Sequence, residues 1–316
     1  MNKITSILLI SIILGAFLFM LNPVSAAIYH IYPADDIEDI IQNHAASGDT
    51  VYIHAGIYYL DDPIDIFVDN LTIIGDSPFN TIIDASSAGG DGIHGEDYIT
   101  IKNITVRDAD STGIYVYDYC IIENCITYDN ENDGIRVDDY SAIKNCLTYD
   151  NDSDGLDADE DCEIINCTSA NNGSDGIEIE DDCNIYNCIF FNNVDDGLEV
   201  DSEGIYIYNS NSWGNGDDNW AYGPSDDVYF INSISVDPKF INGMATFYLS
   251  LSSPCVDSGS TSSAALGLYN GFTTRTDGKW DTGTVDMGFH YSSNRGPPSN
   301  LPMDKILKIL KENQEG

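Results

Sequence analysis

The sequence predicts an all-β fold: a right-handed single-stranded parallel β-helix, or solenoid, of 21-residue coils with an N-terminal capping helix. Two observations predict it. Glycine recurs at a fixed interval of 21 residues through the middle of the chain, and each of these glycines begins a short strand-like pattern. A fixed period indicates a solenoid, in which each repeat buries its apolar face against its neighbours.

The first 26 residues are typical of an export signal. Lys3 precedes an apolar run from Ile4 to Leu21, and Val24 and Ala26 stand at the −3 and −1 positions of a small-residue cleavage site. A membrane anchor is the alternative, but the run is short and the cleavage site is good. We therefore expect residues 1–26 to be a signal peptide and the mature protein to be secreted, either extracellular or at the cell surface. No later segment has the roughly 18 apolar residues that span a bilayer.

Residues 27–90 predict the N-terminal cap and the first coils. Between Asp35 and Ala45 the apolar residues Ile37, Ile40 and Ile41 have helical spacing, which predicts an amphipathic helix. Short β-branched runs bounded by Gly and Asp follow, and they predict the first strands.

The regular β-helix is predicted over residues 91–236, where several residue types recur in columns. The repeated glycines are Gly92, Gly113, Gly134, Gly155, Gly176 and Gly197. An isoleucine column and an asparagine column follow them: Ile101, Ile122, Ile143, Ile164 and Ile185, then Asn103, Asn124, Asn145, Asn166 and Asn187. Each coil contains three short strand-like segments separated by corners, and in the coil that begins at Gly176 these are 176–180, 183–186 and 188–191. In the first of them apolar and acidic residues alternate, as in a half-buried strand.

The periodicity loosens after Gly197, where longer loops carry Trp213, Trp220 and Tyr222. Residues 237–292 are predicted to be a C-terminal closing segment. Residues 293–316 predict a linker and a short amphipathic tail.

These motifs resemble the pectate-lyase-like β-helix proteins, including the asparagine that recurs at a corner of each coil. The segments 48–59 and 69–75 resemble the cap and first coils of that superfamily. Asp237-Pro-Lys-Phe, Ser253-Pro-Cys-Val-Asp-Ser-Gly and Thr282-Gly-Thr-Val-Asp-Met-Gly-Phe-His-Tyr resemble the closing segment of many secreted bacterial and archaeal β-helix proteins. The resemblance spans residues 27–292 and implies the fold and export more than the chemistry.

The charge balance restricts the partners. There are 12 Lys and Arg against 53 Asp and Glu, and the net charge is −41. Nucleic acid and anionic lipid are therefore excluded as expected partners, because both need a basic face. The aromatic content of 11% is that of a folded protein rather than an acidic disordered tail.

The eight cysteines leave three alternatives open. Most stand in two inward columns, and Cys255 stands apart. They are predicted foremost as small buried core side chains. Disulfides between neighbouring coils are the second alternative, since export permits oxidation, and a thiolate metal site is the third.

Basic residues are few, so each can be examined for a catalytic role. Lys102, Glu123 and Lys144 share one column as a charge ladder, and Arg136 shares a column with Asp157. Arg107 has Tyr128 as its column neighbour and no carboxylate is expected beside it. Because pectate-lyase relatives remove a proton α to a uronate carboxyl with a basic side chain, the resemblance makes Arg107 a weak catalytic candidate.

Acidic side chains recur on outward positions and corners of successive coils, and stacked like charges repel one another. Hard oxygen ligands from neighbouring coils suit Ca²⁺; a solvated acidic face in a saline medium is the alternative. The candidate ligands are Asp154, Asp157, Asp175, Glu178, Asp196 and Glu199. A second, weaker cation candidate comprises Asp277, Asp281 and Asp286.

Aromatic side chains on the same strands and in the later loops are candidates for stacking on sugar rings; packing at the end of the solenoid is the alternative. They are Tyr115, Tyr117, Trp213, Trp220 and Tyr222.

Together these patterns predict a monomeric, secreted cell-surface protein that binds polysaccharide, or acts as a structural module, through an acidic cation-binding face. The alternative is a Ca²⁺-dependent polysaccharide lyase or related carbohydrate-active enzyme. Gly92-Ile-His-Gly departs from the polygalacturonase pattern, which weakens the enzymatic alternative at the level of motifs.

Overall fold

The structure is a computed structural model that describes residues 26–200, 203–223, 227–241, 247–269 and 271–292. The predicted signal peptide up to residue 25, and the linker and tail over residues 293–316, lie outside the described residues. Within the described residues no helix is long and apolar enough to cross a bilayer.

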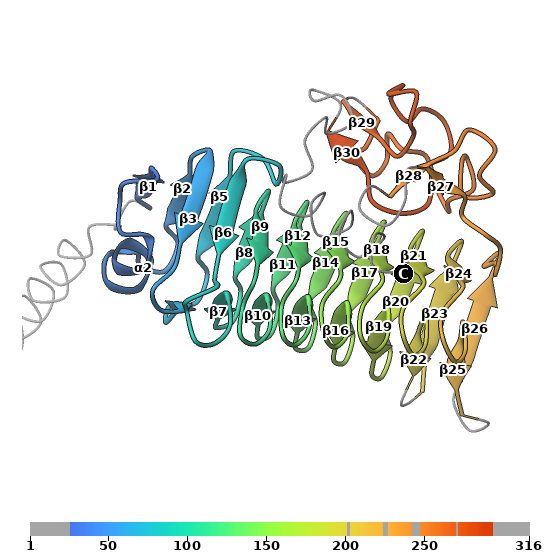
Figure 1. The fold of residues 1–316 in the computed structure, drawn as a ribbon, viewed down its shortest axis with the longest axis horizontal. Helices are drawn as coiled ribbons and strands as arrows, with labels where there is room; N and C mark the ends of the chain where they lie inside the picture. The colour runs from blue at the N-terminus through green and yellow to red at the C-terminus, as the bar shows by residue number, and fades with distance from the viewer. Residues whose placement is uncertain (1–25, 201–202, 224–226, 242–246, 270, 293–316) are drawn as a thin grey trace, which may run out of the picture.

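The predicted β-helix is confirmed: the chain winds through three parallel sheets, called A, B and C here, one strand of each per coil (Figure 1). Sheet A contains β1 (Ile28–Ile31), β2 (Thr50–Ile53), β5 (Thr72–Gly75), β8 (Thr100–Lys102), β11 (Ile121–Glu123), β14 (Ala142–Lys144), β17 (Glu163–Ile165), β20 (Asn184–Tyr186), β23 (Ile205–Tyr208) and β26 (Val228–Ile231). Sheet B contains β3 (Gly56–Tyr59), β6 (Thr81–Asp84), β9 (Thr105–Arg107), β12 (Ile126–Tyr128), β15 (Leu147–Tyr149), β18 (Thr168–Ala170), β21 (Ile189–Phe191) and β24 (Asn211–Trp213). Sheet C contains β4 (Ile64–Ile66), β7 (Ile93–Gly95), β10 (Ile114–Val116), β13 (Ile135–Val137), β16 (Leu156–Ala158), β19 (Ile177–Ile179), β22 (Glu199–Val200) and β25 (Ala221–Tyr222).

The register confirms the 21-residue coil. Ile122 on β11 pairs with Ile101 on β8 and with Ile143 on β14, and this isoleucine column is fully buried. The eight cysteines are buried and free, as expected for core side chains. No single coil could bury these columns alone, so stacking of coils creates the core.

The corner asparagines explain why that residue type recurs. Asn103, Asn124 and Asn145 have φ of 60°, 56° and 50°, in the left-handed region that Asn tolerates better than most other residues. The amide of Asn145 also donates to the Asn124 side chain at 2.8 Å. Each corner therefore both turns the chain and bonds to the neighbouring coil.

A short helix covers the N-terminal end, within the predicted span 35–45. It consists of α2 (Ile37–Asp39) and a π-helical turn η1 (Ile40–His44), and it packs on β4. The Asp36 side chain caps it by accepting from the Asp39 N–H, and Ile37 and Ile41 are buried.

The described residues 237–241, 247–269 and 271–292 lie along the outer side of sheet B (Figure 1). They include β27 (Phe240–Ile241), β28 (Tyr248–Leu249), β29 (Phe272–Thr273) and β30 (Tyr291–Ser292). Phe247, Phe289 and Tyr291 form one apolar cluster with Tyr128 and Tyr149 from sheet B. The closing segment thus covers sheet B from β12 to β21.

Candidate functional site on sheet C

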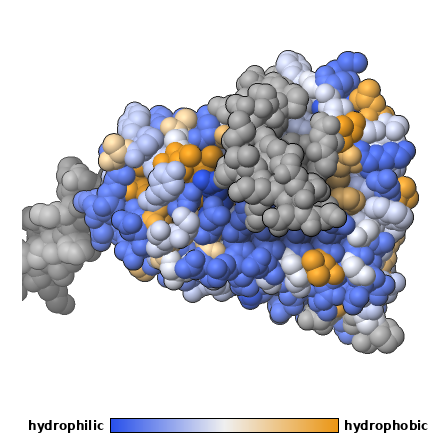
Figure 2. Space-filling model, in the orientation of Figure 1, coloured by the Kyte–Doolittle hydropathy of each residue, from blue (hydrophilic) through white to orange (hydrophobic). Residues whose placement is uncertain are grey.

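Sheet C is the outer face on which basic, aromatic and acidic side chains converge. One outward column runs through His94, Tyr115, Arg136, Asp157, Glu178 and Glu199, on consecutive strands from β7 to β22. The closing segment instead lies over sheet B. Hydrophilic residues dominate the lower margin of the molecule, where sheet C lies (Figure 2).

The Tyr115 ring is held between two neighbours. His94 stacks on it with ring centroids 5.2 Å apart and planes 9° apart, and the Arg136 guanidinium carbon lies 5.5 Å from the ring centroid. Because β10 lies between β7 and β13, these neighbours occupy opposite ring faces. Tyr117 meets Tyr115 edge-on at 5.4 Å. Tyr115 therefore presents its edge and hydroxyl, and neither ring face is left for a sugar.

Arg136 is the cation of this face and has two carboxylate partners. Its Nη1 donates to Asp157 Oδ2 at 2.5 Å, and its Nη2 lies 3.7 Å from Asp159 Oδ1. Burial raises the pKa of Asp157 to about 7, although Arg136 acts in the opposite direction. Near neutral pH, protonation of Asp157 frees part of the Arg136 charge for another anion.

Asp138 lies beside Tyr115 and Arg136 and is the carboxyl best suited to proton transfer. Its pKa is raised to about 6, chiefly by burial and also by the charge of Asp159. Its Oδ1 is buried without a hydrogen-bond partner among the described residues. Burial also raises the pKa of Tyr115, which keeps the phenol protonated as a donor. A base poised near neutral pH beside a phenolic donor and a guanidinium can carry out acid–base chemistry.

The six predicted metal ligands divide into two kinds. Asp154, Asp175 and Asp196 lie at the corner before sheet C and form a ladder: each carboxylate accepts the backbone N–H of the corresponding residue one coil on, at 2.6 to 2.7 Å. Asp157 is paired with Arg136, and Glu178 lies between Asp157 and Glu199 in its column.

The structure brings three of these predicted ligands together. Oxygen atoms of Asp175, Asp196 and Glu199 all lie within 4.8 Å of one another. The pKa of Asp175 is raised to about 8, chiefly by burial and also by the neighbouring carboxyls of Asp154 and Glu199. Asp175 and Asp196 each have a second carboxylate oxygen outside the backbone ladder, so the donor set suits a hard cation such as Ca²⁺.

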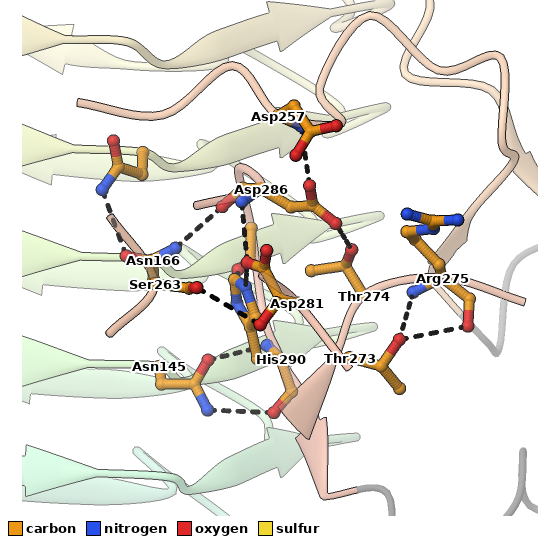
Figure 3. A network of polar contacts seen from close by, with 12 residues as sticks. Asn145, Asn166, Asp257, Ser263, Thr273, Thr274, Arg275, Asp281, Asp286 and His290 are labelled. Atoms are coloured by element: carbon orange, nitrogen blue, oxygen red, sulfur yellow. Dashed lines mark hydrogen bonds and ion pairs between the residues drawn. The ribbon is translucent and has the colours of Figure 1, made fainter. Parts of the chain in front are cut away.

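The second predicted cation group is arranged differently from expectation. Asp277 pairs with Arg275 at 2.9 Å, whereas Asp257 joins Asp281 and Asp286. Figure 3 shows how these carboxylates are used: Asp281 contacts His290 and accepts from the Asp286 N–H, and Asp286 accepts from the Thr274 hydroxyl and the Asp257 N–H. This buried network ties the closing segment together.

The expectation that no carboxylate lies beside Arg107 was wrong. Its Nη2 donates to Asp84 Oδ2 at 2.7 Å, because β6 pairs with β9 in a register that aligns these two residues. The coil between them has 23 residues, so a 21-residue column rule does not find the pair. Arg107 is only 14% exposed and lies on sheet B, away from the face just described.

Comparison with known families agrees with the coil geometry. The description "Right handed beta helix region" matches residues 40–159 and 89–237, which together exceed half of the chain. The chain belongs to the right-handed beta-helix family. No curated protein sequence matches it significantly.

Several solved structures are similar to this chain, and the first of those below shares its fold. The pectate lyase Pel9A is 16% identical, with a TM-score of 0.54, covering 84% of this chain and 98% of that one. The A-module of the mannuronan C-5 epimerase AlgE4 from Azotobacter vinelandii is 20% identical, with a TM-score of 0.47, covering 59% and 68%. The periplasmic alginate epimerase AlgG is 11% identical, with a TM-score of 0.46, covering 61% of each chain.

The remaining aromatic candidates lie at the C-terminal end of the β-helix. Trp220, Tyr222 and Phe230 line a cavity of about 270 Å³ together with Ser233 and Ser235. The Trp220 indole N–H donates to the Ser235 hydroxyl at 2.8 Å, and Tyr222 is 52% exposed. Trp213 lies on sheet B and does not line this cavity.

Two residues of the sheet C site were not singled out from the sequence. The sequence columns predict Arg136 as the ion-pair partner of Asp157, and they do not indicate Asp138. The signal was present, because the 21-residue spacing places His94, Tyr115 and Arg136 in one column. What it could not reveal is the burial that raises the pKa of Asp138.

Proposed function

We propose that this β-helix protein is a secreted carbohydrate-active protein that acts on a polysaccharide lying along the outer face of sheet C. One observation carries the proposal: Asp138, Tyr115 and Arg136 supply a near-neutral carboxyl, a phenolic donor and a cation on one face. The signal-like sequence over residues 1–26 supports export. Pel9A, which shares the fold, is a pectate lyase, and this supports a uronate polymer as the substrate class.

The chemistry that suits these groups is β-elimination from a polyuronate. Asp138 removes the C5 proton, which lies α to the uronate carboxylate, and the electron pair forms the C4–C5 double bond. The C4–O glycosidic bond breaks, and the Tyr115 hydroxyl donates a proton to the leaving oxygen. Arg136 faces the substrate carboxylate and stabilises the charge that develops during proton removal.

A Ca²⁺ ion fits this proposal as a counterion. Asp175, Asp196 and Glu199 would hold it, and it would reduce the repulsion between an acidic protein and an anionic polymer.

The test is incubation of the mature protein with polygalacturonate and alginate in the presence of Ca²⁺, with unsaturated products followed by absorbance. We expect product from wild type, and a loss of about 10²-fold or more for Asp138→Asn, as for removal of a general base. The rate should rise with pH through about 6, because Asp138 must be deprotonated to act. The exposed Asp62→Asn is the matched control. Absence of product from wild type on both polymers would contradict the lyase mechanism.

Binding without catalysis is a second candidate, favoured by the cavity lined by Trp220, Tyr222 and Phe230. Exposed aromatic rings with nearby serine hydroxyls suit the apolar and polar faces of a sugar. In affinity electrophoresis, a binding module would be retarded by polysaccharide without forming product, and Tyr222→Ala would remove the retardation.

A further inference from the structure

We propose that His30 and His54 form a binding site for a divalent transition-metal ion such as Zn²⁺. They lie at the N-terminal end of sheet A, on a different sheet from the candidate site. His30 is on β1, whose register aligns it with Tyr52 on β2, and His54 directly follows β2. The Nδ1 atom of His30 and the Nε2 atom of His54 are hydrogen-bonded at 3.1 Å, so a metal ion would replace the proton that lies between them.

This separation is close to what a tetrahedral zinc ion requires. Two imidazole nitrogens bound at 2.0–2.1 Å in tetrahedral geometry are about 3.3 Å apart. The two rings are stacked with centroids 5.2 Å apart and planes 16° apart, so the His30 ring must rotate for both lone pairs to point at one ion. Imidazole nitrogen selects Zn²⁺, Cu²⁺ or Ni²⁺ over Ca²⁺. His30 is exposed, so water can complete the coordination.

The surroundings orient His54 for this role. Its other nitrogen, Nδ1, faces Asp76 Oδ2 at 3.6 Å, which favours a proton on Nδ1 and leaves the Nε2 lone pair toward His30. Asp76 is itself held, because its Oδ2 accepts the Ala55 N–H at 2.7 Å. The Tyr32 ring stacks on His54 at 4.3 Å and restricts its rotation.

The other three histidines lack such a partner nitrogen. His44 lies against Asp39, His94 stacks on Tyr115, and His290 is buried against Asp281. His44→Ala is therefore the matched control for loss of one exposed imidazole.

The experiment is calorimetric titration of the full chain with Zn²⁺ in excess Mg²⁺, which occupies the carboxylates. We expect one zinc equivalent to bind wild type and His44→Ala alike. His30→Phe and His54→Phe keep an aromatic ring but supply no nitrogen, and each should weaken binding at least tenfold. Asp76→Asn should weaken binding roughly tenfold, as for loss of a supporting carboxylate. Circular dichroism establishes that the variants are folded.

Copper provides a second readout that does not depend on affinity. Electron paramagnetic resonance of one Cu²⁺ equivalent should show two nitrogen ligands in wild type and one in either Phe variant. Zinc affinity unchanged within twofold in both Phe variants would overturn the proposal, as would a copper spectrum with oxygen ligands alone.

Discussion

Two arginines of this molecule have the same chemistry and different surroundings. Arg107 is 14% exposed and its carboxylate partner Asp84 is 7% exposed, on the sheet that the closing segment covers. Arg136 is 38% exposed and lies on the uncovered face, beside Tyr115 and Asp138. Burial thus separates a structural ion pair from a cation that a ligand can reach.

Replacement of Arg107 with alanine should destabilise the fold without removing the chemistry. It leaves Asp84 buried without its cation, and removal of one partner of a buried pair costs about 3–5 kcal/mol. Arg136→Ala should cost less stability, because the pair is more exposed and Asp157 can take up a proton near neutral pH. Urea unfolding measures the loss of stability in each variant. Lyase assays measure whether each variant keeps its activity, which we expect of Arg107→Ala. If Arg107→Ala instead lost activity with its unfolding midpoint unchanged, Arg107 would be the catalytic arginine.

At the scale of elements, the closing segment is attached to the corner asparagines by hydrogen bonds. Asn145 exchanges two with the backbone of His290, at 2.7 and 3.0 Å. Asn166 donates to the Asp286 carbonyl, Asn187 accepts the Ser260 N–H, and Asn209 donates to the Ser258 carbonyl. A corner residue selected for its left-handed backbone thus also holds a segment distant in sequence.

The attachment predicts a difference between two corner positions. Asn145→Ala and Asn124→Ala carry the same backbone penalty, since both residues have positive φ. Only Asn145 bonds to His290, and two lost hydrogen bonds are worth about 2 kcal/mol. Limited proteolysis should therefore release residues 237–292 faster from Asn145→Ala than from Asn124→Ala. Equal rates in the two variants would mean that apolar packing on sheet B alone holds the segment.

At the scale of the whole molecule, the charge of −41 is arranged in ordered columns. The pKa of Asp157 is raised to about 7 and that of Asp175 to about 8, from ordinary values near 4. The folded state therefore binds more protons than the unfolded chain between pH 4 and 8. The free energy of unfolding consequently falls as pH rises through that range.

Cations should reverse this loss. We expect the melting temperature to fall from pH 5 to pH 8, and Ca²⁺ to raise it more than Na⁺ at equal ionic strength. The Ca²⁺ effect should be larger at pH 8, where protons no longer compete for Asp175. Equal effects of the two ions would indicate screening alone. Asp196→Asn should diminish the Ca²⁺-specific part if the cluster binds the ion.

The β-helix could be predicted from the sequence because glycine, isoleucine and asparagine each recur every 21 residues. For the candidate site, the sequence indicated Tyr115 and the acidic columns, but it indicated Tyr115 for stacking on a sugar, whereas His94 and Arg136 occupy its ring faces, and it did not indicate Asp138. Periodicity reports which side chains share a face, but the pKa of Asp138 depends on burial among several coils. The prediction that no carboxylate lies beside Arg107 was wrong because the coil between Asp84 and Arg107 has 23 residues, which places Asp84 outside the regular 21-residue column.

The lateral course of the closing segment has a mechanical consequence. Its bonds to Asn145, Asn166, Asn187 and Asn209 span four successive coils. A single one of these four coils cannot unfold locally unless the closing segment also breaks its hydrogen bonds to the neighbouring coils. Among the described residues, the coils before Asn145 contact the closing segment through apolar side chains such as Tyr128 and Phe79 rather than through a corner asparagine. We therefore expect these earlier coils to open before the four coils that are hydrogen-bonded to the segment.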